Sequence, residues 1–193
     1  MTEAGRASVV AVSKDGHHRF SKKPCAQIIL LEGIGIQGDA HAGVTVQHLH
    51  RRARHPAEPN LRQVHLLPRE FFDEAREEGY ELAPGDLGEN VLTQGLDLAG
   101  LSPDTLLHIG AGAVVRVTGL RSPCVQIDRF RKGLLKAASG RDENGQAVRK
   151  GRDHGRRHHR GRHPPRRQDR CRAAGPTPPH ARVRLSLLRL TAG

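Results

Sequence analysis

The chain has 193 residues, enough for one ordinary domain with a short extension, and it carries a formal net charge of +12. Residues 151–193 contain 12 Arg and 2 Asp, a net charge of +10, so the first 150 residues carry only +2. The chain has only four Phe and one Tyr, none of them in the Arg-rich segment, which argues against a native nucleic-acid-binding domain that stacks bases on aromatic rings.

Neither a secretory signal nor an apolar run of membrane-spanning length is visible, so we expect a cytoplasmic protein with no membrane partner. Three cysteines, Cys25, Cys124 and Cys171, are too few and too scattered for a disulfide framework. A cysteine with a function in this chain is therefore expected to act as a ligand or a nucleophile.

The first predicted elements are two short strands, at residues 8–13 and 26–31, where β-branched and aliphatic residues are bounded by polar residues and Gly. Residues 33–43 contain four Gly in eleven positions. Such a segment favours a flexible loop that can approach a ligand closely with its backbone.

The next predicted elements are a strand and a helix. Residues 61–67 alternate between apolar and polar side chains, which predicts a half-buried strand. Pro68 is expected at the first position of a helix, with Glu70 and Asp73 in its first turn and Gly79 as its stop.

The second half of the domain is predicted to contain three more strands, at residues 89–93, 105–109 and 113–118, the last two joined as a hairpin. A short helix is expected at residues 133–139. The Asn144-Gly145 turn signal then predicts a returning strand, but no apolar segment follows it. The expected fold class is therefore mostly β, within the α+β class.

Residues 151–193 are rich in Arg, Gly, Pro and Ala, from which no hydrophobic core can be built. We therefore expect one domain over residues 1–150 and a disordered basic tail that can be deleted without harm to the fold. Two explanations of the tail remain open: a frameshift that replaced the natural C-terminus, and a genuine basic tail.

The strongest chemical signal is a cysteine in a loop, Cys124 of the segment RSPC. Pro123 fixes the approach of the chain, and the cation Arg121 favours the thiolate, which binds soft metals or attacks electrophiles. A single cysteine in a loop is by itself weak evidence, because an incidental thiol fits the same pattern.

Four separated segments together resemble the signature blocks of MOSC-domain proteins, in particular the small stand-alone bacterial members. In chain order they are GDAHAG (residues 38–43), PNLRQVH (59–65), PGDLGEN (84–90) and RSPC (121–124). The resemblance runs from about Val9 to Lys150 and implies a β-barrel-like fold related to the C-terminal domain of molybdenum-cofactor sulfurases.

The resemblance also implies a function. It implies a molybdopterin-type cofactor with Cys124 as the protein ligand of molybdenum, and an oxidoreductase that reduces small N-hydroxylated compounds to amines. Such an enzyme needs an electron-donor protein as its partner. An association with pyridoxal phosphate binding exists at the level of the family.

The residues expected around the cofactor lie in or beside the four segments. We place Arg62, His65 and Arg121 near the pterin phosphate, with amide hydrogen bonds from Gln63 and Asn90 to the ring edge. The full expected set is Cys124 with Gly38, Asp39, His41, Arg62, Gln63, His65, Glu89, Asn90, Arg121 and Gln126.

Each of these assignments has a structural alternative. Gly38, Gly43, Gly85 and Gly88 could serve only tight turns, and Arg62 and His65 could be solvent-facing residues of a strand. A hard-metal site at Asp39, His41 and Glu89 is disfavoured, and no spacing matches a zinc pattern.

Two other functions stay open at this point: a sulfur carrier with a persulfide on Cys124, and non-specific nucleic-acid binding through the tail.

Overall fold

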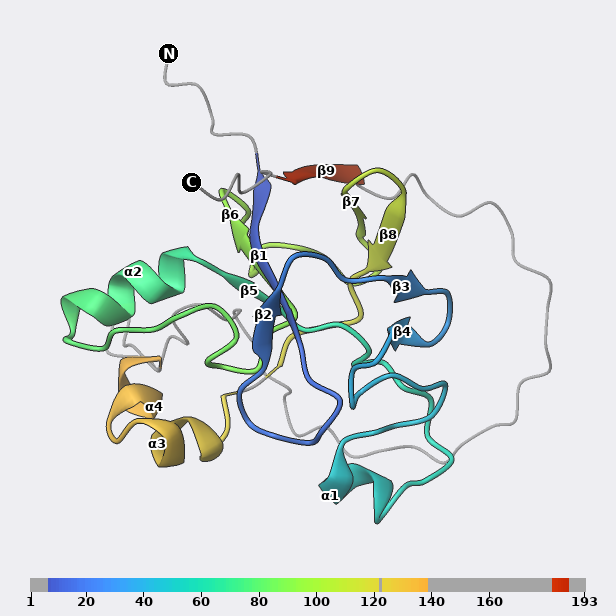
Figure 1. Ribbon diagram of the computed structural model, residues 1–193, viewed down its shortest axis with the longest axis horizontal. Helices are drawn as coiled ribbons and strands as arrows, with labels where there is room; N and C mark the ends of the chain where they lie inside the picture. The colour runs from blue at the N-terminus through green and yellow to red at the C-terminus, as the bar shows by residue number, and fades with distance from the viewer. Residues whose placement is uncertain (1–6, 122, 139–181, 188–193) are drawn as a thin grey trace, which may run out of the picture.

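The computed structural model describes residues 7–121, 123–138 and 182–187, and it is built around one seven-stranded sheet (Figure 1). The sheet has the order β5-β6-β1-β9-β7-β8, and β2 pairs with β1. Its strands are β1 (Ser8–Lys14), β2 (Lys23–Cys25), β5 (Leu66–Pro68), β6 (Val91–Gln94), β7 (Leu106–Ile109), β8 (Ala113–Arg116) and β9 (Arg182–Leu187).

A separate two-stranded sheet joins β3 (Leu30–Leu31) to β4 (Gly35–Ile36). The expectation of a mostly β protein in the α+β class is confirmed. Within the described ranges, however, the main sheet ends at β5 and β8 and does not close into a barrel.

Four short helices complete the described part of the chain: α1 (Leu49–Arg52), α2 (Glu70–Glu77), α3 (Gln126–Phe130) and α4 (Leu134–Ala137). Figure 1 shows α2, α3 and α4 together on one side of β1, with β3, β4 and β8 on the other. Of the helices that the structure describes, none has the length and apolar character needed to cross a membrane.

Because β1 is irregular, its side chains pack into two different hydrophobic clusters. Its register with β6 shifts between Val9 and Ala11, so the usual alternation of side chains is broken there. As a result Val9 and Val12 both pack with Val91 and Leu107, whereas Val10 and Ala11 pack against the cluster formed by the helices. The second cluster, around Leu107, forms the apolar floor of the cavity described below.

Helix α2 confirms the sequence prediction. Phe71, Phe72 and Ala75 are buried, as their helical spacing requires, and Gly79 ends the helix with a φ of +87°. The expected start is wrong by two residues, because Pro68 is the last residue of β5 and pairs with Thr93 of β6. Pro can occupy that place since its fixed φ also suits the end of a strand.

The hairpin of β7 and β8 is also confirmed, with Ile109 paired to Ala113. The strands expected at residues 26–31 and 61–67 are much shorter, and only Leu30–Leu31 and Leu66 to Leu67 are extended in a sheet. In residues 61–65 a side chain replaces a neighbouring strand as a hydrogen-bond partner of the backbone: the Arg62 N–H donates to Asn60 Oδ1 at 3.1 Å. The short helix predicted at residues 133–139 corresponds to α4, and α3 was not predicted.

Strand β9 lies inside the segment that the sequence predicted to be disordered. It runs parallel to both neighbours, pairing Ser186 with Ser8 of β1 and Val183 with Leu107 of β7. Residues 182–187 are the part of this segment that the structure describes, and the strand they form was not predicted from the sequence. The Asn144-Gly145 turn and the rest of the tail lie outside the described residues.

The position of β9 changes the expected effect of a truncation. A chain that ends at Ala181 should lose the hydrogen bonds that connect β1 to β7, and its melting temperature should fall by about 5 °C or more. Thermal unfolding followed by circular dichroism measures this, with a chain ending at Leu187 as the control that keeps β9. Equal melting temperatures for the two truncations would show that β9 contributes nothing to stability.

Candidate functional site

A cavity of about 280 Å³ opens between the second hydrophobic cluster and the loops that carry the sequence motifs. One wall is apolar and includes Leu66, Leu107 and Val115. The other wall is basic: among the described residues that line the cavity, one is Lys, four are Arg and three are His, and none is Asp or Glu. A ligand that suits both walls has an anionic group attached to a flat or apolar body.

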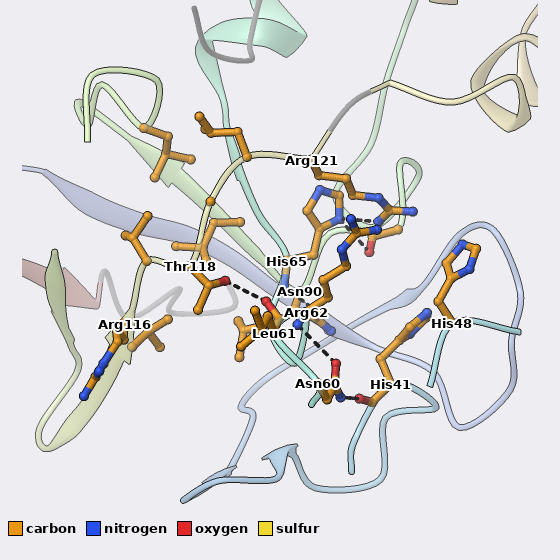
Figure 2. A pocket seen from close by; sticks show the side chains of 18 of the residues that line it. His41, His48, Asn60, Leu61, Arg62, His65, Asn90, Arg116, Thr118 and Arg121 are labelled. Atoms are coloured by element: carbon orange, nitrogen blue, oxygen red, sulfur yellow. Dashed lines mark hydrogen bonds between the residues drawn. The ribbon is translucent and has the colours of Figure 1, made fainter. Parts of the chain in front are cut away.

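The basic wall is formed mainly by Arg62, His65 and Arg121, together with His41 and His48 (Figure 2). Figure 2 shows Arg62 and Arg121 extending toward each other beside His65, while Arg116 points away from this group. Burial lowers the pKa of Arg121; attraction to Cys124 opposes the shift and repulsion from Arg62 adds to it. Two like charges at one wall are stabilised by an anion that binds between them.

Asp39 is the central residue of the site's framework. Its carboxylate is completely buried and accepts hydrogen bonds from Lys22 Nζ at 2.7 Å, Asn90 Nδ2 at 2.9 Å and the His41 N–H at 2.9 Å. Burial alone would raise the pKa of Asp39, but the bonds from His41 and Lys22 hold it well below its usual range. The carboxylate therefore stays ionised and fixes three residues that line the cavity.

Asn60 fixes the next motif to the same framework. Its Nδ2 donates to the carbonyl oxygens of His41 at 2.9 Å and Gly43 at 3.0 Å, which joins residues 59–65 to residues 38–43. The side chain forms an Asx turn with Arg62, so that the chain bends and places Arg62 at the cavity.

The two amides that were expected at a pterin ring are instead engaged with the protein. Asn90 lines the cavity, but its Nδ2 donates to Ser13 O at 3.0 Å and to Asp39, and its Oδ1 accepts from the His65 N–H at 3.1 Å. Gln63 does not line the cavity and donates to the Gly33 and Gly43 carbonyls, at 2.7 and 3.3 Å. These hydrogen bonds let Gln63 and Asn90 hold the loops around the cavity in position.

His65 connects the third and fourth motifs. Its Nδ1 lies 3.1 Å from the Gly88 carbonyl oxygen and 3.2 Å from a guanidinium nitrogen of Arg121. Because a carbonyl only accepts and a guanidinium only donates, the tautomer of the ring decides which contact is a hydrogen bond. A protonated Nδ1 donates to the Gly88 carbonyl in the loop of residues 84–90, and an unprotonated Nδ1 accepts from Arg121, so each tautomer makes one of the two bonds.

Gly85 and Gly88 are required by close packing between two backbone segments. Gly85 has a φ of +91°, and a Cβ there would lie 2.2 Å from the Lys22 carbonyl oxygen; at Gly88 a Cβ would lie 2.4 Å from that of Phe20. These two positions therefore match the structural alternative, in which the glycines hold the loop against the segment that carries Lys22.

A pair of glycine substitutions separates the clash from the backbone strain. Gly85→Ala should lower the free energy of unfolding by about 2 to 4 kcal/mol, because Ala has an unfavourable φ there and also meets the Lys22 carbonyl. Gly79→Ala has nearly the same φ, +87°, with nothing within 4 Å, and should cost only about 1 kcal/mol. Urea unfolding measures both variants, and losses of equal size would refute the close-packing explanation.

Glu89 is buried at 1 % exposure, and it does not line the cavity. One carboxylate oxygen accepts from the Gly85 N–H, and the other has no partner among the described residues. Burial raises the pKa of Glu89 to about 7, against the effect of the backbone bond from Gly85. Its role is to close the turn of residues 84–90.

The raised pKa makes stability depend on pH. The folded chain holds the Glu89 proton more tightly than the unfolded chain, so this stabilisation is complete below about pH 4.5 and is lost as the pH rises through about 7. Between pH 5 and 8 the free energy of unfolding of the parent should fall by an amount on the order of 2 to 3 kcal/mol because of Glu89. Glu89→Gln should not show this fall. Urea unfolding at several pH values tests this, with the exposed Glu81→Gln as control; a Glu89→Gln profile with the parent's slope would exclude Glu89 as the cause.

Cys124 and Gln126 are not among the residues that line the cavity, although Cys124 is near enough to Arg121 to affect its pKa. Cys124 is half-buried directly before α3, and its thiol donates to Gln126 Oε1 at 3.5 Å, a weak contact at the surface. Of the predicted site residues, the structure brings His41, Arg62, His65, Asn90 and Arg121 to the cavity, with Asp39 behind them; Gly38 forms the turn before Asp39 with a φ of +77°.

Lys22 and His48 are among the cavity residues that were not predicted. Lys22 stands in a polar connector and reaches Asp39 from seventeen positions away, a pairing that no local pattern shows. His48 is one of several His in a polar segment and belongs to none of the four motifs. In the described part of the chain, no group of three or more His, Cys, Asp or Glu side chains could hold a metal ion.

The chain is similar to known proteins in sequence and in fold. The sequence model of the MOSC domain matches residues 40–164, more than half of the chain and past Lys150. Among solved structures, the YuaD protein from Bacillus subtilis is 24% identical, with 67% of this chain and 74% of YuaD covered and a TM-score of 0.52.

YiiM from Geobacillus stearothermophilus is 18% identical, with 73% of this chain and 64% of YiiM covered and a TM-score of 0.49. The chain thus spans less than two thirds of the length of YiiM. A comparison with curated protein sequences gave no match. At these identities the likeness to YuaD shows the fold alone.

Proposed function

Because the chain belongs to the MOSC domain family, which is associated with the molybdenum cofactor, we propose that its cavity binds a molybdopterin-type cofactor and that it reduces N-hydroxylated compounds to amines. The observation that supports this proposal is that the four motifs lie close together in space: residues from all four lie in or beside one cavity with a basic wall. The phosphate of the cofactor is the anion that this wall suits.

The residues present fit such a group. Among the described residues the basic wall contains no carboxylate, so its Arg and Lys side chains favour an anionic group. The apolar wall around Leu107 and Val115 offers a dry surface for a ring system. The volume of about 280 Å³ lies just below the roughly 300–1,000 Å³ usual for small-molecule pockets.

Each part of the chain would have a separate task. Arg62 and Arg121 would bind the phosphate, His65 would orient Arg121, and Asp39 with Lys22 would hold the loops in place. Cys124 would supply the soft thiolate ligand, for which serine or a carboxylate is no substitute. Molybdenum, when bound, supplies two-electron oxygen-atom transfer chemistry, which the side chains alone do not.

The overall reaction breaks the N–O bond of an N-hydroxylated base. It consumes two electrons and two protons, and it releases the amine and one water molecule. The electrons come from an electron-donor protein, which an artificial donor can replace in an assay. The apolar wall would shield one face of a bound cofactor from water, which suits a redox reaction.

The test is the reduction of an N-hydroxylated purine or an amidoxime by cofactor-loaded protein with an artificial electron donor. We expect amine formation by the parent and none by Cys124→Ser. Reduction at the same rate by both proteins would remove Cys124 from the mechanism.

One observation favours a second candidate, a sulfur carrier with a persulfide on Cys124. The thiol is half-exposed and lies outside the cavity lining, as a group that receives and passes on sulfur must be. Cyanide-labile sulfur on the purified chain identifies this function, and it should disappear in Cys124→Ser. A chain with bound molybdenum and without labile sulfur would exclude it.

A further inference from the structure

We propose that residues 47–59 form a docking loop for the electron-donor protein, and that the donor presents an acidic surface to this loop. The inference rests on the proposed function, because the reduction needs such a donor. It goes further in naming the surface that the donor contacts and the sign of the charge that the donor carries there.

The docking loop projects from the body of the protein on a closed base. At the base the Val46 N–H donates to the Glu58 carbonyl oxygen at 2.9 Å, and Thr45 forms an isolated bridge with Pro59. No residue of the loop is buried, and Figure 1 shows α1, which the loop contains, at the edge of the molecule and away from the main sheet. A segment that adds nothing to the core is available for contact with a partner.

The docking loop is basic. It contains three Arg and one Glu, and its only acid, Glu58, already pairs with Arg51. Arg52 and Arg54 are exposed and form no ion pair within the described part of the chain. Exposed guanidinium groups without a carboxylate partner favour contact with the carboxylates of another protein.

The docking loop also adjoins the cavity, which identifies the kind of acidic partner. His48 and Arg51 belong both to the loop and to the cavity lining. Burial lowers the pKa of His18, and repulsion from His41 and Arg52 lowers it further. The Arg52 charge is therefore close to the side of the cavity that His41 lines. A protein bound to the loop stands beside the cavity, to which the proposed reaction needs electrons delivered.

One exposed apolar side chain completes the docking loop. Leu49 of α1 is large and apolar, yet it is 51% exposed. An apolar side chain among charged groups has the composition of a protein interface, where an apolar anchor is surrounded by a polar rim. Nucleic acid is a poorer match, because the loop contains no Phe, Tyr or Trp on which a base could stack.

The experiment compares two rates of amidoxime reduction by cofactor-loaded protein, one with reduced flavodoxin as donor and one with an artificial donor. Flavodoxin is a small redox protein with an acidic surface. In the double variant Arg52→Glu with Arg54→Glu, the flavodoxin-driven rate should fall by about tenfold or more, because two attractions become repulsions. The rate with the artificial donor should be unchanged, because neither residue lines the cavity.

Calorimetry of flavodoxin binding gives a readout that needs no turnover. At about 0.1 M salt, where charges more than roughly 10 Å apart are screened, the double variant should bind at least about tenfold more weakly than the parent. The matched control is Lys132→Glu with Lys136→Glu, which makes the same change of charge at two exposed positions near α4 and should bind within about twofold of the parent. Leu49→Ser should also weaken binding, with Val114→Ser, at 50% exposure, as its control.

Three results would overturn the inference. They are the absence of flavodoxin binding by the folded parent, the same affinity in the double variant and its Lys control, and an equal fall of both reduction rates in the double variant. The same affinity in both would mean that the donor responds only to the net charge of the chain. A single-stranded DNA oligonucleotide that binds more tightly than flavodoxin, and no longer binds the double variant, would assign the loop to nucleic acid instead.

The two reduction rates also separate this inference from the proposed function. If the artificial donor supports reduction and the flavodoxin-driven rate does not depend on Arg52 and Arg54, the proposed function stands and the docking loop is excluded. If flavodoxin binds through the loop and neither donor supports reduction, the loop remains a docking site and the proposed function fails.

Discussion

Asp39→Asn should lower the free energy of unfolding by about 3 to 5 kcal/mol, the largest effect on stability that we expect from a single substitution in this chain. The three groups nearest to the Asp39 carboxylate are all donors: Lys22 Nζ, Asn90 Nδ2 and the His41 N–H. The amide nitrogen of Asn would face one of these donors. Lys22, with a side chain only 4% exposed, would also keep a buried charge without its partner.

Urea unfolding at pH 7 measures the effect, and Asp73→Asn is the matched control. Asp73 is half-exposed and pairs with Arg76 at 3.1 Å, so the same substitution there should change stability by about 1 kcal/mol or less. Adding Lys22→Met to Asp39→Asn should recover part of the loss, because the unpaired charge is then removed. A small loss in Asp39→Asn, equal to that of the control, would show that the framework does not depend on this carboxylate.

Cys124→Ser should reduce the molybdenum content of the purified protein to about a tenth of the parent's or less, the largest functional effect that we expect. Serine replaces a soft thiolate with a hard hydroxyl that is normally protonated. The fold should be unchanged, since among the described residues the Cys124 thiol makes only a weak hydrogen bond, to Gln126. Metal analysis of both proteins, with melting curves to confirm folding, measures the effect.

Cys25→Ser is the control for this prediction. The Cys25 thiol is also half-buried, and it donates to the carbonyl oxygens of Val12 and Gln27, which a hydroxyl can do as well. We expect Cys25→Ser to keep the parent's molybdenum content. Loss of metal in both variants to the same degree would mean that Cys124 has no special role.

The elements that could be predicted from the sequence are those whose signals are local. The hairpin of β7 and β8 has alternating strands around a Gly-rich turn, and α2 has apolar residues at helical spacing with Gly79 as its stop. These signals depend on residues that are close in the chain. The family resemblance identified the residues of four motifs, and the structure places most of them at or beside one cavity.

The strand predicted at residues 61–67 is mostly absent because its side chains line the cavity. Residues 61–66 alternate in polarity, as in a strand, but Leu61, Arg62, Val64 and His65 line the cavity instead of the two faces of a sheet. Their backbone is bent by the Asx turn at Asn60, which a pattern of polarity does not show.

The pairing of Lys22 with Asp39 and the parallel pairing of β9 also escape prediction. Both contacts join residues far apart in the chain, and nothing in the local sequence specifies the partner. The same holds for His48, whose position at the cavity follows from the fold of the loop before α1.

The most direct test of the central claim, that the cavity holds a molybdenum cofactor, is the combined molybdenum and pterin content of the protein purified from a host that makes the cofactor. Metal analysis and the fluorescence of the released, oxidised pterin should give comparable amounts, approaching one of each per chain. A folded protein that contains neither molybdenum nor pterin, although the host makes both, would contradict the claim.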